Sequence, residues 1–218
     1  MRGLDGLDNS FRFNPPHVLK PSEEFLMIET RAIPEISWAA SLTSPDASLQ
    51  TTGSSYTPEE IEQFKQRDLL FGAAFAKIVS LLMHSPAHNH LPLSDLRWLV
   101  VPPLLVDQFA IVEAVRAGAA LPSPFAAALW ARVSPEVDRR LSEDKDRSVR
   151  LAAEEWQSGD ILWIIEAVGH PGIVPAFLEE FVAKQFPGRY PKMRVVGKQG
   201  VAKTLFVGLD DLEQELQP

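Results

Sequence analysis

No cysteine occurs among the 218 residues, which excludes disulfide bonds, thiolate nucleophiles and cysteine-containing zinc sites. Long apolar runs are missing as well: no uncharged apolar stretch reaches the roughly 18 residues of a membrane-spanning helix. The opening MRGLDGLDNSFRF contains acidic side chains and lacks the apolar run of about 7 to 15 residues that marks a secretory signal. We therefore predict a cytoplasmic protein with no stable membrane insertion.

Basic side chains are outnumbered, 21 against 29 acidic ones, and the formal charge of -8 repels the phosphates of nucleic acids. Three common motifs are also absent: the G-x-S-x-G nucleophile elbow, the Walker A phosphate loop and the dinucleotide-binding G-x-G-x-x-G. The sequence therefore argues against nucleic acid as a partner and carries no signal for these three kinds of site.

What is present is ordinary globular composition, with 45% hydrophobic and 23% charged residues, and a length that suits one well-packed core. Residues 1–56 differ, because they are rich in Pro, Ser, Thr and Asp and have only brief apolar islands at 25–28 and 36–38. We predict a flexible N-terminal arm there, with one docked segment. The folded domain is expected over residues 57–209, followed by an acidic tail, 210–218.

Order is expected to begin at Thr57, where a capping hydroxyl is followed by Pro58 and two acids, a pattern typical of a helix start. Apolar residues then recur at helical spacing, which predicts a helix to about Met83 whose stripe packs against the core: Ile61, Phe64, Phe71, Phe75, Ile78 and Leu82. The patterns that follow predict a loop at 84–93, an apolar element at 96–101, strands at 108–115 and 125–133, a helix at 134–142, a strand at 161–168, a helix at 175–186, and strands at 193–196 and 204–207. This order implies an α/β fold with helices flanking a mixed sheet.

Three histidines, His84, His88 and His90, lie in the proline-containing loop. Imidazoles at this spacing could bind a metal, but the nearest acid is Asp95, and we assign no metal site. Two interpretations stay open: the histidines face solvent, or one of them is a general base, because imidazole titrates near neutral pH.

Glu166 is the one charged residue in the apolar run 161–168. A buried carboxylate there needs a cation or a proton donor, whereas one at a strand end lies in water. Strict alternation along a strand predicts that Glu166 shares a face with Leu162, Ile164 and Val168.

A stretch without acids lies between Glu180 and Asp210 and contains six basic residues: Lys184, Arg189, Lys192, Arg194, Lys198 and Lys203. In an acidic protein this is a local positive run. It either attracts an acidic partner or a phosphate, or it consists of ordinary solvated side chains.

Two stretches, Ser85-Pro86-Ala87-His88 and the later EWQSGDILWIIE that ends at Glu166, resemble the toxin-activating lysine acyltransferases, the hemolysin-activating proteins of RTX toxin systems. The resemblance covers roughly residues 70–209 and includes Gln108, the strand around Trp130, and Arg194. It implies an N-acetyltransferase-like (GNAT-like) fold. The implied activity is transfer of a fatty acyl group from acyl carrier protein to an internal lysine of an RTX toxin precursor.

The resemblance further implies that His88 is the general base and that Glu166 orients it. We assign substrate binding to five residues of the resembling segments and the basic run: Ser85, Trp130, Asp160, Arg194 and Lys198. No cofactor is expected to be bound, because the loaded carrier protein (acyl-ACP) is the acyl donor. Acyl carrier protein and the RTX-type protoxin are the expected partners, and a homodimer is compatible with the sequence.

The chain departs from the family pattern at three places. Glu166 stands where the family typically has aspartate, Leu99 stands where well-known members have asparagine, and the long arm has no counterpart in compact members. These departures leave other functions open: an acyltransferase with a small amine or a non-toxin acceptor, or a non-catalytic relative that binds the carrier. Acyl chain length and the target lysine have no motif.

Overall fold

The computed structural model describes residues 27–28, 57–115, 121–143, 150–196 and 202–208. The predicted acidic tail and nearly all of the predicted arm lie outside these residues. Within them, five α-helices are found: α1 (Pro58–His84), α2 (Leu96–Leu99), α3 (Val101–Leu105), α4 (Pro135–Glu143) and α5 (Val174–Gln185). Two short 3-10 helices, η1 (Leu93–Asp95) and η2 (Ala153–Gln157), complete the helical part.

The described strands form one six-stranded sheet in chain order: β1 (Met27–Ile28), β2 (Phe109–Ala114), β3 (Ser123–Val133), β4 (Ile161–Gly169), β5 (Lys192–Val196) and β6 (Ala202–Phe206). Neighbouring strands are antiparallel except β4 and β5, which are parallel and joined through α5. The predicted α/β class with a mixed sheet and flanking helices is confirmed, and the predicted strands match within about two residues. Likeness to the N-acetyltransferases stays a prediction.

The two residues of β1 belong to one of the apolar islands of the arm. Met27 and Ile28 pair with Ala114 and Glu113 at the edge of β2. Part of this island is therefore attached to the sheet.

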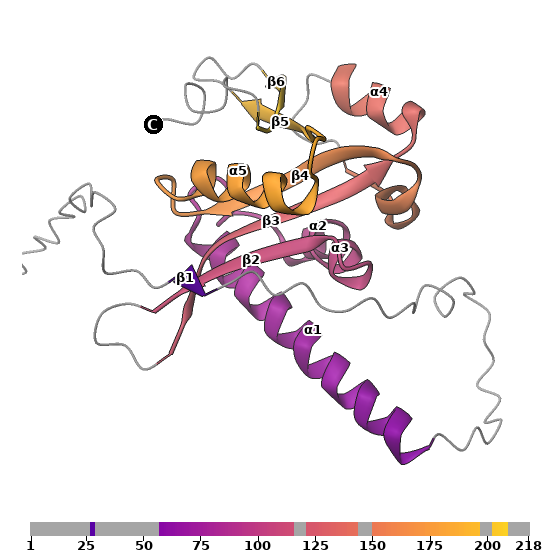
Figure 1. Cartoon of the computed structure of the whole chain (residues 1–218), viewed down its shortest axis with the longest axis vertical. Coiled ribbons are helices and arrows are strands. Elements are labelled where there is room, and N and C mark those ends of the chain that lie inside the picture. Colours follow the sequence, from indigo (N-terminus) through magenta and orange to yellow (C-terminus); the bar gives the residue numbers. More distant parts are fainter. Residues whose placement is uncertain (1–26, 29–56, 116–120, 144–149, 197–201, 209–218) are drawn as a thin grey trace, which may run out of the picture.

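Helix α1 begins as predicted. The Thr57 hydroxyl accepts a hydrogen bond from the Glu60 backbone nitrogen at 3.2 Å, and the Glu60 carboxylate accepts one from the Thr57 nitrogen at 2.7 Å, which completes a capping box. The predicted stripe packs against the core in its second half, where Ile78 and Leu82 are buried. For the first half the prediction is wrong: Ile61 and Phe64 are 42% and 46% exposed, because α1 runs beyond the sheet (Figure 1).

The sheet separates two hydrophobic cores. Alternate residues of β3 point to opposite faces, so Ala127, Leu129 and Ala131 join the core beneath α1, while Ala128 and Trp130 join the core beneath α5. Figure 1 shows α5 lying along β4. None of the described helices is both long enough and apolar enough to cross a membrane.

A β-bulge in β4 changes the predicted direction of Glu166. Leu129 pairs with Glu166, but the next residue, Trp130, pairs with Ile164, so Ile165 is an extra residue in β4. The strict alternation predicted from the sequence is therefore wrong for Ile164, which packs beneath α5, whereas Glu166 contacts the segment that follows α1. Val168, predicted on the same face as Glu166, does join the core on the α1 side.

Candidate active site

His88 is held by a tight turn directly after α1. The helix ends at His84, and Ser85 is its C-cap. The Ser85 carbonyl accepts hydrogen bonds from the backbone nitrogens of His88 at 3.0 Å and Asn89 at 2.9 Å. Because Pro86 disfavours further helix, the chain turns here and directs the His88 side chain toward the sheet.

The His88 side chain meets Glu166, 78 residues later in the chain. His88 Nε2 lies 3.0 Å from Glu166 Oε2, and His88 Nδ1 lies 2.8 Å from Ser85 Oγ. An ionised carboxylate can only accept, so Nε2–H donates to Glu166, and in the neutral ring Nδ1 accepts from the Ser85 hydroxyl. The three side chains thus form one hydrogen-bonded row from carboxylate to imidazole to hydroxyl.

Both members of the central pair are largely shielded from water. The side chains of His88 and Glu166 are 18% and 20% exposed. Glu166 Oε1 also accepts a hydrogen bond from the Ala167 backbone nitrogen at 3.0 Å, which fixes the carboxylate plane. The hydrogen bond from His88 to Glu166 raises the pKa of His88, the negative charge of Glu166 adds to this effect, and burial opposes it.

This row can take up a proton. A neutral imidazole held by a carboxylate is the arrangement of a general base, and the carboxylate stabilises the imidazolium that forms. No group of three His, Asp or Glu side chains suited to a metal ion occurs in the described part of the chain, and the His84 ring instead donates from Nδ1 to the Ser80 carbonyl at 2.7 Å.

Comparison with protein-family models identifies residues 69–206 as matching the RTX toxin acyltransferase family. The match covers well over half of the 218 residues, and both His88 and Glu166 lie inside it. The chain belongs to the RTX toxin acyltransferase family. A comparison with curated proteins found no match. The matched region of this acyltransferase ends with β6, and the first half of α1 precedes it.

Five residues were assigned to substrate binding, and of the four that the structure describes only Ser85 bonds to His88 or Glu166. Trp130 is buried beneath α5, where its ring lies 5.0 Å from that of Phe181. Asp160 lies at the start of β4 with its side chain 86% exposed and paired with Arg132 at 2.7 Å. Arg194 lies on β5, and Lys198 lies outside the described residues. Their roles in substrate binding stay predictions.

The basic run is in part paired with acids of the acyltransferase itself. Lys184 bonds to Glu180 at 2.7 Å within α5, and Lys192 bonds to Asp138 of α4, also at 2.7 Å. Arg189 donates to the Asp160 carbonyl. The bond of Lys192 joins β5 to α4, and the bond of Arg189 joins the segment after α5 to the turn before β4, so part of the run stabilises the fold.

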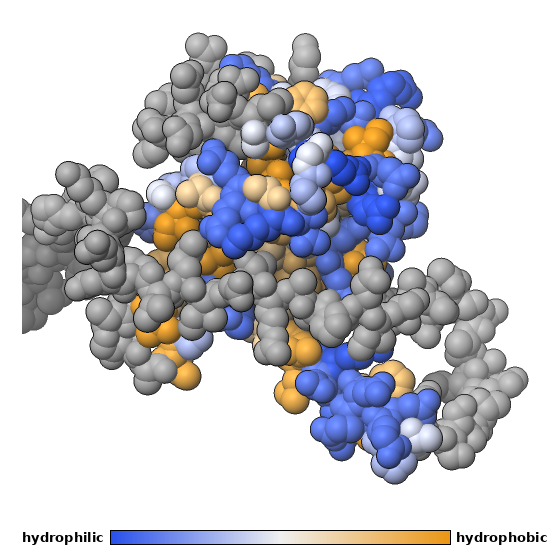
Figure 2. Space-filling model, in the orientation of Figure 1, coloured by the Kyte–Doolittle hydropathy of each residue, from blue (hydrophilic) through white to orange (hydrophobic). Residues whose placement is uncertain are grey.

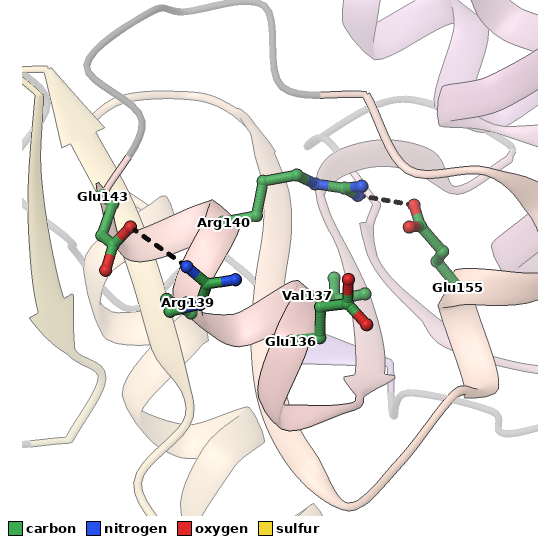
Figure 3. Close-up of a pocket in the computed structure, with 6 residues that line it drawn as sticks. All are labelled: Glu136, Val137, Arg139, Arg140, Glu143 and Glu155. Atoms are coloured by element: carbon green, nitrogen blue, oxygen red, sulfur yellow. Dashed lines mark hydrogen bonds and ion pairs between the residues drawn. The ribbon is translucent and has the colours of Figure 1, made fainter.

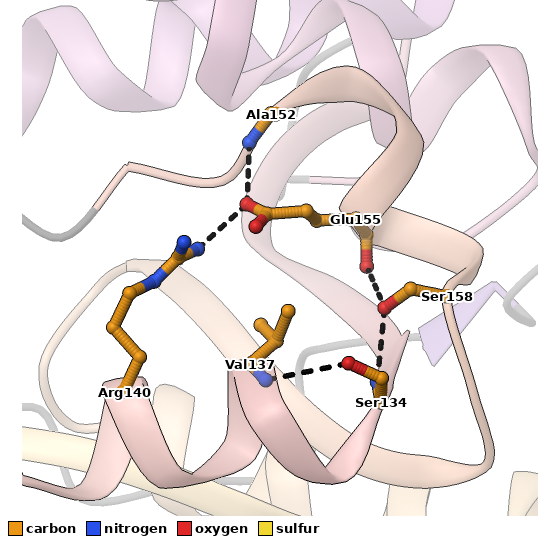
Figure 4. Close-up of polar contacts among 6 residues, drawn as sticks. All are labelled: Ser134, Val137, Arg140, Ala152, Glu155 and Ser158. Atoms are coloured by element: carbon orange, nitrogen blue, oxygen red, sulfur yellow. Dashed lines mark hydrogen bonds and ion pairs between the residues drawn. The ribbon is translucent and has the colours of Figure 1, made fainter.

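The EWQSGD segment holds the start of β4 in place (Figure 4). The Ser158 hydroxyl donates to the Glu155 carbonyl at 3.0 Å and accepts from the Ser134 backbone nitrogen at 2.9 Å. Glu155 Oε2 accepts from Arg140 at 2.6 Å and from the Ala152 backbone nitrogen at 2.8 Å. The bond from Arg140 lowers the pKa of Glu155, the bond from Ala152 acts in the same direction, and burial opposes both. The most specific stretch of the family resemblance is thus largely a structural device that positions the strand carrying Glu166.

A surface hollow that the sequence did not predict lies between α4 and η2 (Figure 3). Its lining is Glu136, Val137, Arg139, Arg140, Glu143 and Glu155, and none of the predicted site residues is among them. Figure 3 shows two ion pairs there, Arg139 with Glu143 at 4.0 Å and Arg140 with Glu155 at 2.6 Å. No sequence signal marked this hollow, because its charged residues look like an ordinary solvated helix face.

Proposed function

We propose that this chain transfers a fatty acyl group from acyl carrier protein to an internal lysine of an RTX protoxin in the cytoplasm. The observation that carries the proposal is the half-buried, hydrogen-bonded row of Glu166, His88 and Ser85 in a chain that belongs to the RTX toxin acyltransferase family. A general base is what lysine acylation requires, because a lysine amine has a pKa near 10.4 and is protonated at neutral pH.

In the proposed reaction the Ser85 hydroxyl accepts a hydrogen bond from the lysine amine and donates its own to His88 Nδ1, 2.8 Å away. The lysine ammonium first gives one proton to water, and the neutral amine nitrogen then attacks the thioester carbonyl. As the carbon–nitrogen bond forms, a second proton passes by way of the Ser85 hydroxyl to Nδ1, and Glu166 stabilises the imidazolium. The carbon–sulfur bond then breaks, and the carrier thiolate leaves and takes the proton from His88. The products are the lysine amide and the free carrier thiol.

Direct transfer agrees with the residues available. The sequence contains no cysteine, so no thioester can form on this chain, and the acyl group passes from carrier to lysine while both are bound. The carrier is proposed to bind near the basic residues of β5 and β6, Arg194 and Lys203, with Lys198 between them in the chain. An acidic carrier would favour such a surface by complementary charge.

The test is co-expression of the full chain with an RTX protoxin and acyl carrier protein, followed by peptide mass mapping of the protoxin. His88→Ala is expected to lower the rate of lysine acylation by roughly 100-fold or more, because the proton acceptor is lost. His90→Ala is the matched control, since His90 is an exposed histidine of the same loop, and it should retain the parent rate.

Glu166 is tested in parallel, since this position is where the chain departs from the family pattern. Glu166→Asp keeps a carboxylate and should lose less activity than Glu166→Gln, which keeps the size but removes the charge. Equal rates for Glu166→Gln and the parent would remove Glu166 from the mechanism. An acyl group found on a small amine or another protein, and not on the protoxin, would overturn the proposed acceptor.

A further inference from the structure

The loop that carries His88 has little support of its own. Between Pro86 and Ser94 only His88 and Leu91 are half-buried, and the other seven residues are exposed. Its backbone hydrogen bonds are local, because the Ser85 carbonyl accepts from the His88 nitrogen and the His88 carbonyl accepts from the Leu91 nitrogen. Such bonds give the turn its shape, and the two ends of the loop determine its distance from β4.

The upstream end of the loop is anchored by the second half of α1, where Ile78, Leu81 and Leu82 are buried. The first half of this helix extends away from the sheet (Figure 1), and Figure 2 shows a largely hydrophilic surface over it. One buried helical stretch therefore holds this end of the loop.

The downstream end of the loop is held by Asp95, the one charged residue that is buried in the described part of the chain. Its side chain is 8% exposed, and Arg150 Nη2 lies 2.9 Å from Asp95 Oδ1 and 3.0 Å from Oδ2. The Arg150 guanidinium also lies over the Trp98 ring of α2, 5.7 Å from its centroid. A buried carboxylate is unfavourable without a cation, so Asp95 depends on Arg150 to stay inside.

Arg150 belongs to the segment that leads into β4. The next residue, Leu151, is buried in the core beneath α1, and η2 follows with the fully buried Trp156. The strand β4 then begins at Ile161 and carries Glu166. The ion pair therefore connects the end of the His88 loop with the approach to the strand of Glu166, across 55 residues of the chain.

We propose that Asp95 and Arg150 are positioning residues, which hold the loop so that His88 stays within hydrogen-bond distance of Glu166. Among the described residues, this ion pair and the bond of His88 to Glu166 are the two hydrogen-bonded contacts of the loop with distant parts of the chain. The bond to Glu166 is 3.0 Å long, and a hydrogen bond is lost at about 3.6 Å, so the site tolerates only a small displacement. This role rests on the proposed function of His88.

The first test is a titration of the His88 ring, followed by NMR of the full chain, with the signal assigned by its loss in His88→Ala. In the parent the bond to Glu166 raises the pKa of His88 above the ordinary 6.5. Arg150→Met removes the cation, so the Asp95 carboxylate should move into water and draw the end of the loop with it. The bond to Glu166 is then weakened, and the midpoint of the His88 titration should move to lower pH.

Two further variants separate this role from a general loss of stability. Arg150→Lys keeps a cation beside Asp95 and should retain most of the parent midpoint. Glu113→Gln removes another ion pair of α1, that of Lys77 with Glu113 at 2.8 Å, whose side chains are 36% and 24% exposed. It should leave the His88 titration unchanged, whether or not the melting temperature falls. A parent midpoint in Arg150→Met, or an equal change in Glu113→Gln, overturns the proposal.

The second test is the kinetics of protoxin acylation, with rates referred to the folded fraction of each variant. Arg150→Met should lower kcat by about tenfold while KM for the protoxin changes by less than about twofold, because a misplaced base affects the reaction rather than binding. Arg150→Lys should recover most of the rate. A parent kcat in Arg150→Met overturns the proposal. The titration needs neither carrier nor protoxin, so its failure is distinct from failure of the proposed function.

Discussion

His88 differs from the other three histidines that the structure describes, because both of its ring nitrogens are engaged, Nε2 by Glu166 and Nδ1 by Ser85. The hydrogen bond and the charge of Glu166 favour the imidazolium, whereas partial burial favours the neutral ring. The net effect is a raised pKa, so the imidazole is a stronger base than a free histidine. The Glu166 carboxylate therefore favours protonation of His88 and also determines which ring nitrogen carries the proton in the neutral form.

The raised pKa of His88 predicts the pH dependence of acylation. A general base acts in its neutral form, so kcat/KM should rise with pH and level off above the His88 pKa, which lies higher than the ordinary 6.5. In Glu166→Gln the negative charge is lost and burial remains, so the midpoint of this acid limb should move to lower pH. The measurement is kcat/KM for protoxin acylation across the pH range. A midpoint that is unchanged in Glu166→Gln would contradict the electrostatic role of the carboxylate.

Ser85 is expected to contribute less than His88. Ser85→Ala should lower the acylation rate by roughly 10-fold, since a water molecule can take the place of the hydroxyl in passing on the proton. Ser85→Thr retains a hydroxyl and should keep most of the rate. Initial rates of protoxin acylation are the measurement. A loss in Ser85→Ala as large as that in His88→Ala would indicate that the hydroxyl does more than relay a proton.

At the scale of elements, the site depends on how β4 begins and where it bulges. Gly159 lies so close to β3 that a Cβ would be 2.5 Å from the Val133 carbonyl oxygen and 2.7 Å from Ser134 Cα. The extra residue Ile165 then turns Glu166 to the face that His88 reaches. The turn fixes the position of the strand, and the bulge selects the face.

Gly159→Ala should destabilise the protein by about 1–3 kcal/mol, because the methyl group must displace the backbone of β3 rather than a flexible side chain. Chemical denaturation monitored by tryptophan fluorescence gives the free energy of unfolding. Gly188→Ala is not a suitable control, since Gly188 has a positive φ of 73°. Gly72→Ala is suitable, because a Cβ there meets nothing, and it should leave the monomer equally stable or more so.

At the scale of the whole molecule, the sheet separates His88 and Glu166 from Trp130, one of the residues predicted to bind substrate. His88 and Glu166 lie on the α1 side, whereas Trp130 packs with Phe181 and Phe186 on the α5 side. Trp130 belongs to the resemblance and is explained here by core packing, as Trp156 is on the α1 side. Similarity to a family therefore marks residues that maintain the fold as well as the candidate catalytic residues.

The sequence alone determined the features that depend on neighbouring residues. The Thr57 capping box, the hairpin of β2 and β3, the α4 start at Pro135 and the strand after Ser158-Gly159-Asp160 follow from capping groups, prolines and apolar spacing, all of which act within a few residues. The pairing of His88 with Glu166 was implied by the family resemblance, and no local pattern contained it.

Only the tertiary structure decided which side chains meet and which helix faces stay uncovered. The bulge at Ile165 arises from the register between β3 and β4, so alternation counted along β4 alone wrongly places Glu166 on the same face as Ile164. The exposure of Ile61 depends on where the sheet ends beneath α1, and a stripe looks the same in sequence whether or not anything lies under it. Contacts between residues far apart in the chain have no local energetic signature, and the bond between His88 and Glu166, separated by 78 residues, is such a contact.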